Sequence, residues 1–207
     1  MTAPPIRIAV LLSGSGTSLE NLFEKIDDGL SARVVAVIAS KQDAFGLERA
    51  RSRSIPAFAI PRKRYPDVGA FNDAIHAVLD DFEVDLVLLL GFLSPFETRG
   101  RFDGCTMNVH PALIPAFSGP GFYGHRVHQA VLAAGVKQSG ATVHFVGAEY
   151  DSGPIILQEA VPVEDDDTPD SLAERVQACE RRLVPRAVQL FAEDRLRIKD
   201  RQVHIRD

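Results

Sequence analysis

Residues 6–18 read IRIAVLLSGSGTS, an apolar run that changes abruptly into glycines and small polar residues. The run Ile6–Leu12 predicts a buried strand, and the pattern from Ser18 to about Asp27 predicts a helix. A second apolar run, Val34–Ala39, predicts another strand. Strand, helix and strand in this order predict a βαβ unit with parallel strands.

The same alternation continues beyond this unit. Residues 84–90 predict a strand, and LVLLL at 86–90 lacks the polar alternation of a sheet face exposed to water. We therefore predict an α/β fold with a Rossmann-like, doubly wound, mostly parallel central sheet. The other expected elements are helices near 45–52, 68–81, 127–134 and 168–193, and strands near 57–60, 106–109, 141–146 and 155–161. The last helix begins at Thr168-Pro169, and we expect Pro185 to kink or divide it.

The composition is that of one continuous globular fold, with 45% hydrophobic and 25% charged residues among 207. A net charge of -5 provides no electrostatic footprint for nucleic acid or an anionic membrane, so small molecules or proteins are the expected partners. Neither a membrane-spanning run nor a signal-peptide pattern is found, which predicts a cytoplasmic location. Cys105 and Cys179 lack paired spacing, and we interpret both as buried residues outside any disulfide or zinc cluster.

The segment Ser13–Ser18 is a candidate phosphate site, because backbone N–H groups, hydroxyls and the dipole of the following helix converge there. It is neither a Walker A loop nor a complete dinucleotide fingerprint, since Leu19 replaces the third glycine. The second strand ends in Ser40-Lys41 without an acidic residue for a ribose hydroxyl. Taken alone, the segment is equally consistent with a tight turn whose serine caps the helix.

Asn108 and His110 end a predicted strand, where period-2 alternation places both side chains on one side. An amide that donates a hydrogen bond beside a chargeable imidazole suits acyl transfer, whose tetrahedral intermediate carries an oxyanion. The alternative is a polar strand end whose Asn caps the next loop.

Asp151 lies in the turn Tyr150–Pro154, where Asp commonly bonds its own backbone. If it faces His110 instead, its carboxylate would orient the imidazole and raise the imidazole pKa. His144 lies between apolar residues of a predicted strand, and we interpret it as a hydrogen-bonded histidine of the core or behind the site.

His125 and His128 are three residues apart, but without an HExxH motif or a cysteine pair we expect a solvated helix face and no metal site. Gln177 and Glu180 share a helix face and could bind a cationic amine. The alternative there is a solvated face with ordinary ion pairs, formed with Arg175, Arg181 and Arg182.

Several segments together resemble the phosphoribosylglycinamide formyltransferase family, over residues 6–196. The resemblance is carried by IAVLLSGSGT at 8–17, DAFGLERA at 43–50, NVHPALIPAF at 108–117 and GATVHFV at 140–146 leading into DSGPII at 151–156. The chain departs from the family pattern at Ser18, where Asn is usual, and after Gly91-Phe92, where Met-Arg-Ile is missing. The loop 117–124 is also longer and richer in glycine.

The resemblance implies one formyltransferase domain over 1–207, with a phosphate-binding half at about 1–100 and a folate-binding, catalytic half at about 101–200. It implies 10-formyltetrahydrofolate as formyl donor, glycinamide ribonucleotide as acceptor, no metal, and a monomer or homodimer. By position it makes Asn108 the oxyanion donor, His110 the imidazolium and Asp151 its carboxylate partner, with His144 behind them. The implied contacts are Gly14, Ser15, Gly16, Thr17 and Ser18 for the ribotide phosphate; Glu180, Gln177 and Pro111 for the glycinamide part; and Phe92, Leu93, Val146, Gly147, Tyr150 and Asp151 for folate.

The alternative functions are those of other enzymes or of a protein without catalytic activity. A formyltetrahydrofolate deformylase uses water as acceptor, but that family usually has an additional N-terminal regulatory domain and lacks the Gly-x-Gly loop. A methionyl-tRNA formyltransferase would need a C-terminal RNA-binding domain. A non-catalytic phosphate-binding module has no need for Asn108, His110 and Asp151 together. An oxidoreductase would need the third glycine and the acidic residue for a ribose hydroxyl, which this sequence lacks.

Overall fold

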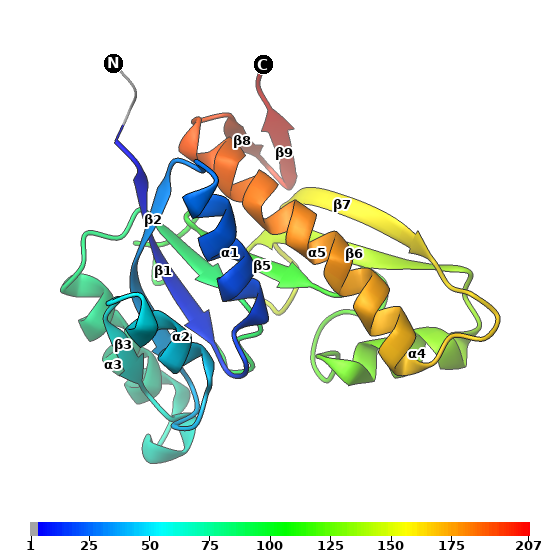
Figure 1. Ribbon diagram of the computed structural model, residues 1–207, viewed down its shortest axis with the longest axis horizontal. Coiled ribbons are helices and arrows are strands. Elements are labelled where there is room, and N and C mark those ends of the chain that lie inside the picture. The colour runs from blue at the N-terminus through cyan, green and yellow to red at the C-terminus, as the bar shows by residue number, and fades with distance from the viewer. Residues whose placement is uncertain (1–3) are drawn as a thin grey trace. The chain divides into compact units, whose positions relative to one another are not determined.

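The computed structural model describes residues 4–207 and has an α/β fold whose central sheet is mostly parallel, as predicted (Figure 1). Its contacts divide the chain into two compact units, one up to Met107 and one from Asn108 onward. Strand β5 (Thr106–His110) spans this boundary. Within residues 4–207, no helix is both long enough and apolar enough to cross a membrane.

The first unit contains the predicted βαβ arrangement. Its strands pair in parallel in the order β3-β2-β1-β4. Their bounds are β1 (Ile6–Leu12), β2 (Ala32–Ala39), β3 (Ala57–Ala59) and β4 (Leu86–Leu89). The connecting helices are α1 (Thr17–Asp27), α2 (Gly46–Ser52), the short 3-10 helix η1 (Arg62–Arg64) and α3 (Val68–Asp80).

Strand β1 lies in the core of this unit and fixes where the following loop begins. Residues 8–12 are fully buried, as are Leu19 and Leu22 of α1. Each fully buried leucine contributes about 1.5–3 kcal/mol relative to an exposed one, so the junction of β1 and α1 is firmly held. Strand β4 starts two residues later than predicted. Just before it, the Asp85 backbone N–H donates to the Arg7 carbonyl (2.9 Å), and the Asp85 carboxylate accepts from the Arg7 backbone N–H and guanidinium (2.8 and 3.0 Å).

The second unit contains strands in the order β6-β7-β9-β8. The pairs β6 (Gln138–Phe145) with β7 (Ile155–Pro162), and β8 (Leu196–Lys199) with β9 (Gln202–Ile205), are antiparallel, whereas β7 and β9 are parallel. Helix α5 (Pro169–Ala192) contacts α4 (His125–Ala134) and crosses β6 and β7 (Figure 1). The β8–β9 hairpin was not predicted.

Helix α5 begins as predicted and ends where expected, but it is not divided. The Thr168 Oγ1 accepts from the Ser171 N–H (3.2 Å), and Ser171 Oγ accepts from the Thr168 N–H (2.9 Å). The helix continues through Pro185 to Ala192 as one element (Figure 1), so of the two expected effects, a kink or a division, the division does not occur. An internal proline costs about 3 kcal/mol, and burial of the apolar residues around it offsets that cost. These are Leu183, Val184, Ala187 and Val188.

Candidate active site

The side chains of Asn108 and His110 project from the end of β5 toward a common partner, Asp151. Asn108 Nδ2–H donates to Asp151 Oδ1 (3.3 Å), and His110 Nδ1 lies 3.4 Å from Asp151 Oδ2. The strand alternation that placed Asn108 and His110 on one side is therefore confirmed. The side chains of His110 and Asp151 are only 4% and 10% exposed, so when the imidazole is protonated the two charges interact with little screening by water.

His144, on β6, lies behind this pair. Its Nδ1–H donates to the Phe145 carbonyl (2.8 Å), which leaves Nε2 of the neutral ring as an acceptor. Nε2 accepts from Asn108 Nδ2–H (3.2 Å) and lies 3.6 Å from Asp151 Oδ1. The prediction of a buried, hydrogen-bonded histidine is confirmed, and its tautomer fixes the orientation of the Asn108 amide.

His110 is held from both ring nitrogens. Nε2–H donates to the Phe117 carbonyl (2.8 Å), while Nδ1 faces the Asp151 carboxylate. Because both oxygens only accept, this geometry suits an imidazolium with two N–H groups.

The net pKa of His110 is lowered, contrary to the expectation of a raised value. Burial lowers the pKa most, and the charge of Asp151 together with the bond to Phe117 raises it by less. The expectation considered only the carboxylate and omitted the loss of water around the ring.

Asp151 stays ionised despite its burial. Burial raises its pKa, but the net shift is downward, because the charge of His110 and the Gly119 N–H, which donates to Oδ2 (3.0 Å), favour the carboxylate. Sequence reasoning missed the backbone contributions of Phe117 and Gly119. The signal available was the glycine-rich stretch that follows β5, but a sequence pattern does not specify where a loop carbonyl points.

In the first unit, the loop between β1 and α1 is held by its own serine and by α2. The buried Ser13 hydroxyl accepts from the Leu93 N–H (2.8 Å) and lies 2.6 Å from the Ser40 hydroxyl. Arg49 of α2 donates to the Ser15 carbonyl (2.9 Å). Gly14, Ser15 and Thr17 are exposed, and Gly16 and Ser18 are half-buried, so the loop faces solvent at the positive end of α1.

Gly16 explains the shape of this loop. Its φ is +73°, and a Cβ there would lie 2.7 Å from the Gly46 Cα. The Gly46 N–H also donates to the Gly14 carbonyl (3.1 Å). Support by Gly46 and Arg49 was not predicted, although both lie in one of the segments that carry the family resemblance.

Glu180 is half-buried on α5 and Gln177 is exposed one turn earlier. Burial raises the pKa of Glu180 to about 7, and the charge of Arg181 opposes it only weakly. Arg175 forms an ion pair with Asp167, and Arg182 forms one with Glu159. Neither arginine pairs with Glu180 in these contacts. An unneutralised carboxylate of this kind suits a cationic or amine ligand.

The residues implied to contact folate fall in both units. In the first, Phe92 is half-buried and stacks with Phe71 (ring centroids 6.3 Å apart), while the Leu93 side chain is 53% exposed. In the second, Val146 and Gly147 are half-buried beyond the end of β6, and Tyr150 is 57% exposed. Pro111, which follows His110, is half-buried. Their roles stay predictions.

Two expectations about other side chains need correction. His125 is exposed and pairs with Asp170. His128 is buried, because α4 turns it toward the interior of its unit. Within residues 4–207, no cluster of histidine, cysteine or carboxylate residues could hold a metal ion. Cys179 is buried as expected, but Cys105 is only half-buried.

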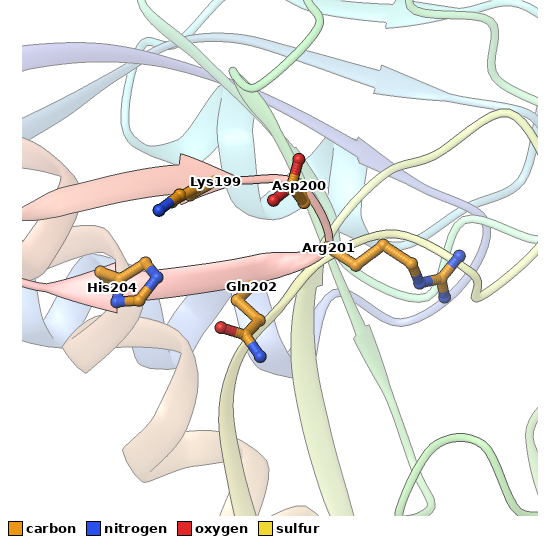
Figure 2. A pocket seen from close by; sticks show the side chains of 5 residues that line it. All are labelled: Lys199, Asp200, Arg201, Gln202 and His204. Atoms are coloured by element: carbon orange, nitrogen blue, oxygen red, sulfur yellow. The ribbon is translucent and has the colours of Figure 1, made fainter.

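The C-terminal hairpin forms a hollow of about 410 Å³, lined by Lys199, Asp200, Arg201, Gln202 and His204 (Figure 2). Figure 2 shows Lys199 and His204 on adjacent strands, with Arg201 pointing away from them. The lining includes no residue expected to take part in formyl transfer, so this hollow adds nothing to the candidate site.

Comparison with known proteins defines the class. Residues 6–188 match the family model described as formyl transferase, and the chain belongs to this family. It is 41% identical to the chloroplastic phosphoribosylglycinamide formyltransferase of Arabidopsis thaliana, over 94% of this chain and 68% of that protein. It is 36% identical to the phosphoribosylglycinamide formyltransferase of Haemophilus influenzae, over 96% and 93% of the two chains.

Solved structures agree with these sequence comparisons. Glycinamide ribonucleotide transformylase 1 from Symbiobacterium toebii superposes with a TM-score of 0.92 at 43% identity, covering 98% of this chain and 95% of that one. Some relatives are much longer. The chain spans 19% of the length of the trifunctional purine biosynthetic protein adenosine-3 of Bos taurus.

Proposed function

We propose that this chain transfers the formyl group of 10-formyltetrahydrofolate to the amine of glycinamide ribonucleotide, giving formylglycinamide ribonucleotide and tetrahydrofolate. The observation that carries the proposal is the buried cluster of Asn108, His110 and Asp151, with His144 fixing the amide of Asn108. Such a cluster supplies hydrogen bonds to an oxyanion and a proton carrier beside it. Membership of the formyl transferase family supports the same reaction.

In this mechanism the substrate amine attacks the formyl carbon, and a new C–N bond forms as the carbonyl oxygen becomes an oxyanion. To stabilise that oxyanion, one Asn108 Nδ2–H would exchange its contact with Asp151 Oδ1 (3.3 Å) for the oxyanion, and His110 Nε2–H would exchange the Phe117 carbonyl (2.8 Å) for it. The C–N bond to the folate nitrogen then breaks, and the proton lost by the attacking amine ends on that nitrogen. His110 assists this proton transfer, Asp151 holds the imidazolium, and a covalent enzyme intermediate is not required.

We assign the remaining roles by chemistry. Residues 14–18 would bind the ribotide phosphate through backbone N–H groups and hydroxyls at the start of α1. Glu180, with Gln177 and Pro111, would contact the glycinamide portion. Folate would be bound by Phe92, Leu93, Val146, Gly147, Tyr150 and Asp151. A cytoplasmic location and a monomeric or dimeric state stay predictions.

The test measures tetrahydrofolate formation with and without glycinamide ribonucleotide, for the wild type, Asn108→Ala and the control Gln202→Ala. Loss of one preorganised oxyanion donor typically lowers kcat by about 10²–10³-fold, so Asn108→Ala should fold normally and be nearly inactive. Gln202→Ala removes an exposed amide on β9 and should retain full activity. Folate breakdown that does not need the ribotide would indicate a deformylase, and the absence of turnover would indicate a binding module.

A further inference from the structure

The turn between β6 and β7 has no room for a side chain at Gly153. A Cβ at this buried position would overlap the Phe145 carbonyl oxygen and would lie 2.8 Å from the Phe145 carbonyl carbon and 2.9 Å from the Gly147 N. All three are backbone atoms, so no flexible side chain could move aside. Glycine is therefore what allows the turn to fold back directly onto the end of β6.

This close approach involves the atoms that orient the candidate site. The Phe145 carbonyl oxygen is the acceptor for His144 Nδ1–H (2.8 Å), and the Phe145 N–H donates to the Pro154 carbonyl (2.9 Å). Gly153 thus packs against the carbonyl that determines the His144 tautomer. That tautomer in turn presents Nε2 to the Asn108 amide.

The same turn carries Asp151, two residues before Gly153. Asp151 has a φ of +52°, a left-handed conformation that Asp tolerates better than most residues. Its carboxylate reaches His110 and Asn108 only while the turn stays folded onto β6, since both partners lie on β5. The contact between Gly153 and the Phe145 carbonyl therefore supports two features of the site: the orientation of the Asn108 amide and the position of the Asp151 carboxylate.

We propose that Gly153 is a positioning residue for formyl transfer, which acts by holding the Phe145 carbonyl and the Asp151 turn in register. The kinetic part of this proposal rests on the proposed function. A larger residue must displace either the carbonyl or the turn. Displacements of about 1 Å in a catalytic arrangement can cost about 10²-fold in rate.

The experiment compares the wild type with Gly153→Ala and uses Ser152→Ala as control. Ser152 lies in the same turn and donates to the Glu149 carbonyl (2.9 Å), so its replacement loosens the turn without adding volume at the contact. We expect Gly153→Ala to lower kcat about 100-fold with the KM for the ribotide within about 2-fold of wild type. Ser152→Ala should keep kcat within about 2-fold.

A second readout does not require activity. The ¹⁵N NMR spectrum of the imidazoles should report Nδ1–H for His144 in the wild type and in Ser152→Ala, and a changed tautomer balance in Gly153→Ala. If wild-type protein lacks formyl transfer, the proposed function fails while this spectrum still decides the positioning role. Unchanged His144 signals in folded Gly153→Ala would overturn the proposal, whatever happens to kcat.

Pro154→Ala provides the test if Gly153→Ala does not fold. Proline restricts the residue before it to extended conformations, so its removal frees Gly153 without introducing a clash. Pro154→Ala should then lower kcat several-fold and change the His144 tautomer balance. A Pro154→Ala protein with wild-type kcat and wild-type His144 signals would refute the role of this contact.

Discussion

Glu180 allows a prediction that needs no substrate. Burial raises its pKa to about 7 from an ordinary 4.5, so its ionised form is disfavoured in the folded chain. At about 1.4 kcal/mol for each pKa unit, ionisation would cost the folded state about 3 kcal/mol. Because the side chain is only half-buried, we discount this cost to about 2 kcal/mol.

The sign follows from proton binding. Between pH 4.5 and pH 7 the folded chain holds the Glu180 proton more tightly than the unfolded chain, so the free energy of unfolding falls as the pH rises. The loss is complete above pH 7. Glu180→Gln removes this titration, so the variant should gain stability over the wild type progressively from pH 5 to pH 8.

The assay is urea unfolding at pH 5, 6, 7 and 8, with the difference between variant and wild type as the measured quantity. Glu174→Gln is the matched control, because Glu174 is exposed on the same helix and its replacement should produce a difference that does not change with pH. If the difference in free energy of unfolding between Glu180→Gln and the wild type stays constant from pH 5 to pH 8, the argument that burial raises the Glu180 pKa is refuted.

Two further changes test the other parts of the site. Asp151→Asn removes the charge that raises the His110 pKa and leaves burial to lower it further, so the limb of the pH–rate profile that reports imidazolium should move to lower pH; an unmoved limb counts against the pairing. Gly16→Ala places a Cβ 2.7 Å from the Gly46 Cα at a φ of +73°, so the loop between β1 and α1 must distort. The expected result is a KM for glycinamide ribonucleotide raised about 10-fold with kcat little changed, and an unaltered KM would argue against phosphate binding by this loop.

The strands and helices of the parallel part could be predicted because their signals are local. The run Ile6–Leu12 is found as a strand with the predicted bounds, and α1 and α3 begin or end within one residue of expectation. The β8–β9 hairpin was missed because Leu196 is the buried residue that anchors it, and charged side chains occupy much of the rest. A division at Pro185 was wrongly allowed for, because the cost of a proline is a local quantity, whereas the packing that offsets it is not.

The candidate site was predictable only where side-chain identity carries the information. Asn108 and His110 were placed on one side of a strand by period 2, and that pattern does not depend on distant contacts. The approach of Asp151 depends on how the turn after β6 folds back. The acceptor for His110 Nε2 is a backbone carbonyl, a group that every residue type has, so the sequence around Phe117 could not identify it.

The protonation of His110 depends on burial and on its two polar contacts, which act in opposite directions. Burial favours the neutral ring, while Asp151 and the Phe117 carbonyl both require N–H donors and favour the imidazolium. A group held between opposing effects of this kind can change its protonation state at small cost, which is what general acid–base catalysis near neutral pH demands. The lowered pKa is therefore compatible with the proposed mechanism, since a strongly stabilised imidazolium would hold a proton that formyl transfer has to move.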